Sequence, residues 1–222
     1  MIKLIKYLIF KLLGFKNYLR ITQRTYLFLY KTGFLKFNSN YEYHYFVKHL
    51  INKGDVIIDI GANLGHYSLL FARWTGDSGK VISIEQIKTY NEIFNEQAIK
   101  HRNITLYPYI LSSEEETVES ASLPVKKPSV LFGNLDIINY IKCDIKEVEY
   151  TILLDIKDIL SKFKPIVQVK ASPDNEKKLL ELFNELGYTP YKLNKFQLIP
   201  QNESDNPLPG DYIFIAESSP EP

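Results

Sequence analysis

Short apolar runs and longer helix-like segments alternate along most of this chain. Runs of β-favouring residues between polar or glycine residues predict strands at Val56–Ile60, Val81–Glu85, Ile104–Tyr107, Tyr140–Asp144, Pro165–Val169, Tyr191–Leu193, Phe196–Ile199 and Tyr212–Ile215. Segments with apolar residues three and four positions apart predict helices at Ser68–Trp74, Tyr90–Lys100, Val148–Phe163 and Asn175–Leu186. This alternation is typical of an α/β fold, so we expect a Rossmann-like, doubly wound, mostly parallel sheet.

The two ends of the chain differ from this alternating part. Residues 1–50 are predicted to be a helical extension with breaks at Gly14 and Gly33, because glycine disfavours a helix interior. Residues 51–217 contain the alternating pattern and are expected to form one α/β domain. Residues 218–222 are expected to be a disordered tail.

The composition fits a folded protein in a reducing compartment. Of the 222 residues, 45% are hydrophobic and 24% are charged, which is enough for a domain with a sizeable core. The single cysteine, Cys143, excludes an internal disulfide and indicates the cytoplasm. We expect no cleavable signal peptide, because no small-residue cleavage site follows an apolar region.

The net charge of +1 is unevenly distributed along the chain. Residues 1–54 carry ten Lys and Arg and one acidic residue, whereas the remainder carries 17 basic and 25 acidic residues. A basic arm fits a polyanion, a membrane surface or a partner protein, but it also fits helices whose outer faces are simply solvated. The apolar segment Ile2–Phe15 is too short to span a bilayer, so membrane contact through residues 1–20 would be peripheral.

The most specific motif is the glycine-rich turn after the first strand, Gly61-Ala62-Asn63-Leu64-Gly65. Open α/β sheets bind nucleotide-like ligands at such a turn, because glycine lets the backbone turn sharply where a Cβ would clash. Asn63 tolerates left-handed backbone geometry better than most residues. A similar turn also occurs in βα connections that bind nothing, so this motif needs support from other residues.

Two carboxylates are expected at the same edge of the sheet as this turn. Glu85 ends the second strand, twenty residues after Gly65, where it could accept both hydroxyl hydrogens of a ribose. Asp144 ends a later strand, where it could orient a substrate hydroxyl or act as a base. An alternative role for Asp144 is to cap the helix that follows.

Taken in order, Gly54–Leu69, Val81–Glu85, Tyr140–Asp144 and Lys162–Gln168 resemble the FkbM-type S-adenosylmethionine-dependent methyltransferases. The resemblance runs from about Tyr41 to Ala216, and the ordered set is more specific than any single motif. It implies a class I methyltransferase fold, S-adenosyl-L-methionine as cofactor and O-methylation, often of a sugar or glycan hydroxyl. The expected partner is therefore a small-molecule or glycan acceptor.

The resemblance also implies roles for individual residues. The residues that it implies in cofactor binding are Asp59, Gly61, Ala62, Asn63, Gly65, Glu85 and Ile110. Among these, the turn residues would contact the methionine end of the cofactor, Glu85 would hold the ribose and Ile110 would border the adenine. Asp144 is the candidate catalytic residue.

The chain departs from the family's pattern on the acceptor side. The family usually reads Asp-Val/Ile-Glu-Gly where this chain has Asp144-Ile145-Lys146-Glu147, and Lys170 stands where a Glu often follows the next strand. A lysine cannot do the acid–base or metal-binding work of a carboxylate. Three hypotheses remain open. In the first, the acceptor has changed to an anionic one. In the second, the protein is a catalytically impaired binding or scaffold protein. In the third, Glu147 or Glu149 takes over the role of the missing carboxylate.

Two other classes of activity fit the sequence less well. A nicotinamide-dependent dehydrogenase would need a glycine where Asn63 stands, because the backbone must approach a pyrophosphate there. Methylation of a nucleic-acid base amine would call for an Asn/Asp-Pro-Pro-aromatic motif, which the sequence lacks, so we expect no nucleic-acid partner. The four histidines lack the spacing of metal ligands, so we expect no metal.

Overall fold

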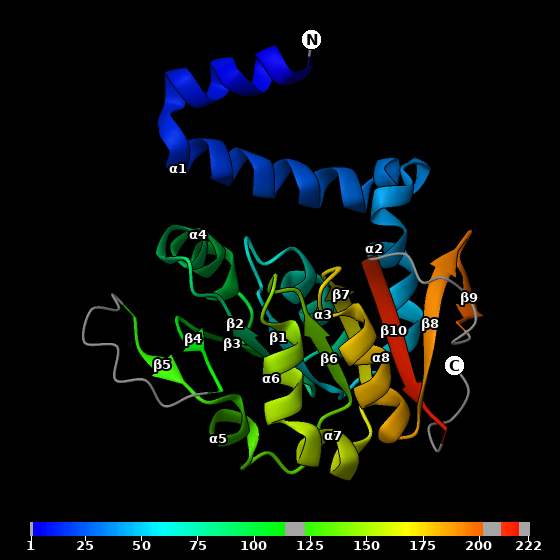
Figure 1. The fold of residues 1–222 in the computed structure, drawn as a ribbon. Helices are drawn as coiled ribbons and strands as arrows, with labels where there is room; N and C mark the ends of the chain where they lie inside the picture. Colours follow the sequence, from blue (N-terminus) through cyan, green and yellow to red (C-terminus); the bar gives the residue numbers. More distant parts are fainter. Residues whose placement is uncertain (1, 114–122, 202–209, 218–222) are drawn as a thin grey trace.

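An eight-stranded sheet forms the centre of the molecule in the computed structural model, which describes residues 2–113, 123–201 and 210–217 (Figure 1). Its strands are β1 Val56–Ile60, β2 Lys80–Ile84, β3 Ile104–Tyr107, β6 Tyr140–Cys143, β7 Ile166–Ala171, β8 Tyr188–Asn194, β9 Gln197–Pro200 and β10 Gly210–Ala216. Two further strands, β4 Ile110–Leu111 and β5 Val125–Lys126, pair with each other in a separate small sheet.

The strands of the large sheet lie in the order β3-β2-β1-β6-β7-β10-β8-β9. Strands β3, β2, β1, β6 and β7 are parallel, whereas β10 is antiparallel to both of its neighbours, β7 and β8. This arrangement confirms the predicted doubly wound, mostly parallel sheet. Because the parallel strands end at one edge, the loops that follow β1, β2 and β6 meet there.

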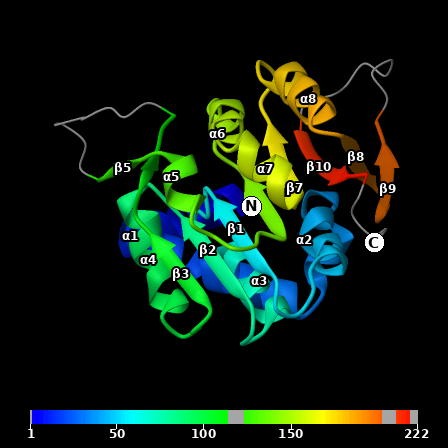
Figure 2. The same cartoon turned by 90° about the horizontal axis from the view of Figure 1, so that it is seen from below.

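Helices cover both faces of the sheet. They are α1 Ile2–Lys31, α2 Glu42–Phe46, α3 His66–Thr75, α4 Lys88–Ala98, α5 Pro128–Phe132, α6 Glu149–Asp155, α7 Lys157–Phe163 and α8 Glu176–Glu185. Three short 3-10 segments, η1 Phe34–Phe37, η2 Ser39–Tyr41 and η3 Val47–Leu50, lie between α1 and β1. Helices α6, α7 and α8 lie on one face of the sheet, and α2 and α3 lie on the other (Figure 2).

Successive residues of β1 are buried on opposite faces of the sheet. Ile58 packs in the core that includes Phe183 of α8, whereas Ile57 packs in the core that includes Phe71 of α3. Burial on both faces is usual for a parallel sheet. Asp59 therefore lies on the same face as Ile57, toward α3, with Ser83 of β2 and Lys142 of β6 beside it in register.

The long first helix crosses the edge at which the parallel strands end (Figure 1). Gly14 interrupts it with φ 74° and ψ 167°, and Gly33 follows its end with φ 78°, so both predicted helix breaks are confirmed. No helix among the described residues combines the length and apolar character needed to cross a membrane. Peripheral membrane contact through residues 1–20 stays a prediction.

Polar side chains attach α1 to the rest of the molecule. Lys16 pairs with Glu92 of α4 at 2.6 Å, and the Arg20 guanidinium donates to both carboxylate oxygens of Glu96 at 2.6–3.1 Å. The side-chain amide of Gln23 is buried and donates to a backbone carbonyl in the turn after β1 at 2.6 Å. The half-exposed ion pairs each contribute roughly 0.2–1 kcal/mol, so the buried Gln23 contact is the more specific attachment.

One predicted helix is wrong, because the structure has two helices in its place. The stretch Val148–Phe163 forms two helices, α6 and α7, because Ile156 leaves helical geometry with φ −104° and ψ 20°. Ile152 and Leu160 are nevertheless both buried, so the apolar stripe that suggested one helix continues across the break. The short elements α5, β4 and β5 were not predicted, and the tail 218–222 lies outside the described residues.

Gly65, which precedes α3, has two independent reasons to be glycine. Its backbone is left-handed with φ 77° and ψ 20°, and a Cβ there would overlap the buried ring of Phe94. Gly33 has nearly the same backbone, with φ 78° and ψ 2°, but open space around it. Substitutions at the two glycines therefore distinguish the cost of backbone strain from the cost of steric overlap.

We predict that Gly33→Ala lowers the free energy of unfolding by about 1–2 kcal/mol, the cost of a left-handed alanine. Gly65→Ala should lower it by about 1–3 kcal/mol more, because the Phe94 ring must also move. Urea unfolding of both variants, followed by circular dichroism, measures the difference. Equal losses at the two positions would contradict the packing described for the turn.

Candidate functional site

The glycine-rich turn folds back against the ends of two neighbouring strands. The amides of Gly61 and Ala62 both donate to the Ile84 carbonyl at 3.0 Å, which joins the turn to the end of β2. Asn63 has the left-handed backbone expected of it, with φ 53°. A Cβ on Gly61 would overlap the backbone carbonyl of Asp144, so this glycine permits close approach to the residue that follows β6.

Glu85 lies directly after β2 and faces this turn. One oxygen of its carboxylate accepts a hydrogen bond from the Asn63 amide at 2.6 Å, and the other accepts one from the Ile87 amide at 2.7 Å. The residue is only 4% exposed. Burial raises the pKa of the Glu85 carboxyl, and the two amide donors oppose that rise. The sequence-predicted Gly61, Ala62, Asn63 and Glu85 therefore lie together.

Asp59 lies beneath the turn, in a buried ion pair with Lys142 of β6. The strand register places the two residues side by side, with the Lys142 ammonium 3.7 Å from one oxygen of the Asp59 carboxylate. The Ser68 hydroxyl donates to the other oxygen at 2.5 Å, and the Tyr67 ring lies 4.8 Å from the ammonium. Because Asp59 is fully buried, it would act on a ligand through these neighbours rather than by contact.

Asp144 lies at the open end of the same pair. Its carboxylate is 3.5 Å from the Lys142 ammonium, and its side chain is 35% exposed. Burial lowers the pKa of Lys142, but the carboxylates of Asp59 and Asp144 outweigh it and hold that pKa above its ordinary value. Helix α6 begins five residues later with Val148 at its N-cap, so the alternative that Asp144 caps this helix is wrong.

Ile110 lies in a different sheet from these residues. It belongs to the small β4-β5 sheet, where its amide donates to the Pro124 carbonyl at 3.0 Å. The Glu85 amide donates to the Tyr107 carbonyl at 3.1 Å, which joins the end of β3 to the residue that follows β2. The implied contact of Ile110 with an adenine stays a prediction.

An aromatic and histidine cluster at this edge was not predicted as part of the site. The Tyr26 hydroxyl of α1 lies 2.5 Å from Nδ1 of His44, and its ring stacks on His66 with centroids 4.0 Å apart. His44 in turn stacks on Tyr67, at 4.2 Å. Burial lowers the pKa of His44 to about 3 and that of His66 to about 4, so both rings are neutral at pH 7.

The acceptor side contains a carboxylate that sequence reasoning also missed. Strand β10 pairs with β7 so that Asp211 stands opposite Lys170, one of the two lysines that depart from the family's pattern. Burial raises the pKa of the Asp211 carboxyl, and the positive charges of Lys170 and Lys142 oppose that rise. Lys170 therefore lies opposite an acidic residue on the neighbouring strand.

The two glutamates proposed as substitutes for the family's carboxylate differ in environment. Glu149 is fully buried and accepts hydrogen bonds from the Ser172 amide, at 2.7 Å, and from the Ser172 hydroxyl. Glu147 is exposed, as is Lys146. Glu147 also has a left-handed backbone with φ 70°, a conformation that glycine adopts without strain.

Comparisons with known proteins identify the fold. No protein-family model and no curated protein matches the chain. A solved FkbM methyltransferase from Methylobacillus flagellatus KT is 18% identical, with a TM-score of 0.58, covering 79% of this chain and 47% of that one. Aeropyrum pernix fibrillarin, with natively bound S-adenosyl-L-methionine, is 10% identical, with a TM-score of 0.51, covering 75% and 68%. The fold is that of the class I methyltransferases.

These structural similarities show the fold and not the function. A candidate rRNA methylase from Clostridium thermocellum shares the fold at 12% identity, with a TM-score of 0.50, covering 80% of this chain and 93% of that one. The same fold is therefore found in a protein described as acting on RNA, and the expectation of no nucleic-acid partner stays a prediction. The chain spans about half the length of the FkbM protein, and membership of that family also stays a prediction.

The neutral histidines lead to a prediction about pH. A histidine with a lowered folded-state pKa binds protons better when unfolded, so stability is lost as pH falls below about 6.5. For His66 this loss continues down to about pH 4 and amounts to at most about 1.4 kcal/mol per pH unit. His66→Phe should therefore show a flatter decline of unfolding free energy between pH 6.5 and 4 than the wild type. Parallel curves for the variant and the wild type would contradict the burial of the His66 ring. The control is His49→Gln, which replaces an exposed histidine.

The backbone of Glu147 leads to a second prediction. Glu147→Gly should raise the free energy of unfolding by roughly 0.5–1 kcal/mol, because glycine adopts a positive φ without strain. Glu147→Ala removes the same carboxylate but keeps the strain, so it should not stabilise the protein. Thermal unfolding of the two variants compares them directly, and equal stabilisation would mean that the charge rather than the backbone matters.

Proposed function

We propose that this protein is an S-adenosylmethionine-dependent O-methyltransferase whose acceptor is a sugar or glycan hydroxyl. The observation that carries the proposal is the joining of Glu85 to the glycine-rich turn through the Asn63 amide, at the edge where the parallel strands end. The class I methyltransferase fold and the bound cofactor of the fibrillarin neighbour support it. The sugar acceptor rests on the sequence resemblance alone.

The types of residue at this site fit the cofactor. A carboxylate oxygen has more than one acceptor site, so Glu85 can hold the backbone amides of Asn63 and Ile87 and still accept ribose hydroxyls. Gly61 and Gly65 let the turn pack closely against Asp144 and Phe94, which keeps its backbone next to Glu85. When bound, the cofactor supplies an activated methyl group.

The chain's own residues would then position the acceptor and move its proton. Asp144 is partly exposed and would accept a hydrogen bond, and then the proton, from an acceptor hydroxyl. Lys142 holds the Asp144 carboxylate in place by an ion pair at 3.5 Å, and α1 lies across the same edge (Figure 1). Positioning supplies most of the rate advantage in such a transfer.

Binding of S-adenosylhomocysteine, measured by titration calorimetry, tests the cofactor half of the proposal. We expect the wild type to bind, and we expect Glu85→Gln to weaken binding by about tenfold or more, because a charged hydrogen-bond acceptor is lost. Glu181→Gln, an exposed glutamate of α8, makes the same change of charge and should leave binding unchanged. Absence of binding by the wild type at millimolar ligand would overturn the proposal.

A second candidate function is a binding or scaffold protein that has lost catalysis, which the exposed lysine at 146 and the Lys170 substitution favour. Methyl transfer from labelled S-adenosylmethionine to a panel of sugars separates the two functions. Asp144→Asn should abolish transfer while preserving S-adenosylhomocysteine binding. Binding by the wild type without transfer to any acceptor would instead support the scaffold function.

A further inference from the structure

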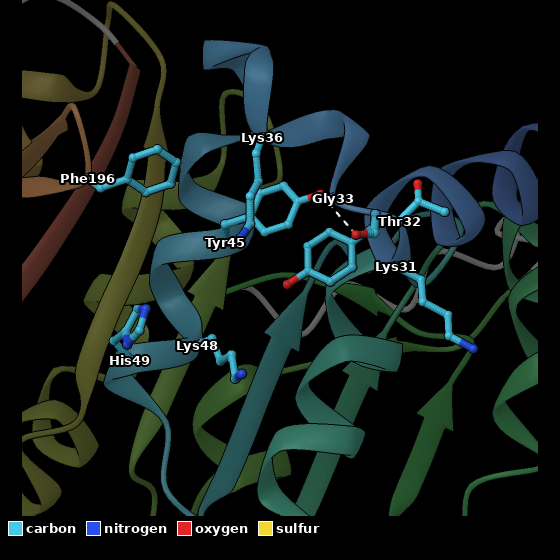
Figure 3. A pocket seen from close by; sticks show the side chains of 9 residues that line it. Lys31, Thr32, Gly33, Lys36, Tyr45, Lys48, His49 and Phe196 are labelled. Atoms are coloured by element: carbon cyan, nitrogen blue, oxygen red, sulfur yellow. Dashed lines mark hydrogen bonds between the residues drawn. The ribbon is translucent and has the colours of Figure 1, made fainter.

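A cavity lies beside α2, next to the aromatic and histidine cluster of the proposed methyl-transfer site. In this helix His44 stacks on Tyr67 at that site, whereas the next residue, Tyr45, lines the cavity. The cavity has a volume of about 720 Å³, within the range of small-molecule sites. The residues that line it are Tyr30, Lys31, Thr32, Gly33, Lys36, Tyr45, Lys48, His49 and Phe196 (Figure 3).

The charged residues of this cavity are all basic. Lys31, Lys36 and Lys48 line it together with His49, and no carboxylate does. Within the described part of the chain, no carboxylate oxygen lies within 4.0 Å of these three ammonium groups. Three positive charges therefore line the cavity without a carboxylate among its lining residues, and the electrostatic potential there favours an anion.

Among the described residues, direct hydrogen bonds to the last carbonyls of α1 do not occupy these lysines. The last carbonyls of α1 already accept hydrogen bonds from nearby groups: that of Phe28 from the Thr32 amide, and that of Tyr30 from the Gly33 amide and the Tyr45 hydroxyl, all at 3.0 Å. With these carbonyls satisfied, the ammonium groups remain available for a ligand.

Aromatic rings give the cavity firm walls. Tyr30 and Tyr45 stack with centroids 4.4 Å apart, and the Lys36 ammonium lies over the Tyr45 ring at 5.4 Å (Figure 3). Phe196 enters from the turn between β8 and β9, where its amide donates to the Glu42 carboxylate. Walls that are ordered before a ligand arrives reduce the entropy lost on binding.

We propose that this cavity binds a phosphate ester, independently of the proposed methyl transfer. Lysine ammonium groups bind phosphate oxygens through charge-assisted hydrogen bonds, and three lysines suit the phosphate or diphosphate group of such an ester. A soluble phosphate ester and a phospholipid headgroup both supply this chemistry. For the second source, Phe34 and Phe37 in η1, next to Lys36, are 67% and 91% exposed and could enter a lipid surface.

The soluble source is tested with pyrophosphate as the probe, by titration calorimetry at low salt. The cavity variant Lys36→Gln/Lys48→Gln should weaken binding at least tenfold relative to the wild type. The matched control Lys80→Gln/Lys157→Gln removes the same charge from exposed lysines elsewhere and should stay within twofold. All four lysines are exposed, so both variants should keep the wild-type Tm, which confirms that they are folded.

The lipid source is tested by co-sedimentation with vesicles of phosphatidylcholine alone or with 30% phosphatidylglycerol. Binding that requires the anionic lipid, falls at least fivefold in the cavity variant and falls likewise in Phe34→Ser/Phe37→Ser supports the headgroup as the ligand. Pyrophosphate binding that Phe34→Ser/Phe37→Ser leaves intact supports a soluble ester.

Two results would overturn the proposal. One is that the wild type binds neither pyrophosphate nor anionic vesicles. The other is that the cavity variant and the control variant lose binding equally. That result would mean that the net charge of the protein, and not the cavity, determines binding. Neither result bears on S-adenosylhomocysteine binding, so failure here and failure of the proposed function are separate.

Discussion

The buried pair of Asp59 and Lys142 is the constraint on which the site depends. Removing a carboxylate and an ammonium from water costs several kcal/mol for each ion, and only close partners offset that cost. The pair joins the two central strands, β1 and β6, side by side. Because a slip of one residue would send one partner to the opposite face of the sheet, the pair fixes the register of these strands. The turn after β1 and Asp144 after β6 are thereby held at a constant relative position.

The N-terminal helices add a second layer to this arrangement. Tyr26 of α1 contacts His44 of α2 and His66 of α3, so three helices meet over the Tyr67 ring that lies beside Lys142. Each imidazole replaces water above a buried charge. Lys142 is thereby buried at 4% exposure, whereas the Asp144 side chain beside it stays 35% exposed.

Local patterns in the sequence predict the elements of this structure but not the contacts between distant segments. The strands Val56–Ile60 and Ile104–Tyr107, the left-handed Asn63 and the position of Glu85 at the end of a strand follow from signals within a few residues of each position. The contact of Tyr26 with His66 spans forty residues, and the position of Asp211 depends on the insertion of β10 between β7 and β8. No local period encodes either of these. The break at Ile156 was missed for the opposite reason, because its buried side chain continues the apolar stripe.

The position of α1 has a consequence for kinetics. A ligand that occupies the edge of the parallel strands cannot leave freely while this helix lies across it, so the residence time of such a ligand depends on how often α1 detaches. Two of the attachments, Lys16 to Glu92 and Arg20 to Glu96, are half-exposed ion pairs, whose strength falls as salt screens them. The buried Gln23 amide is not screened in this way. Ionic strength would thus change the lifetime of the covered state while leaving its geometry intact.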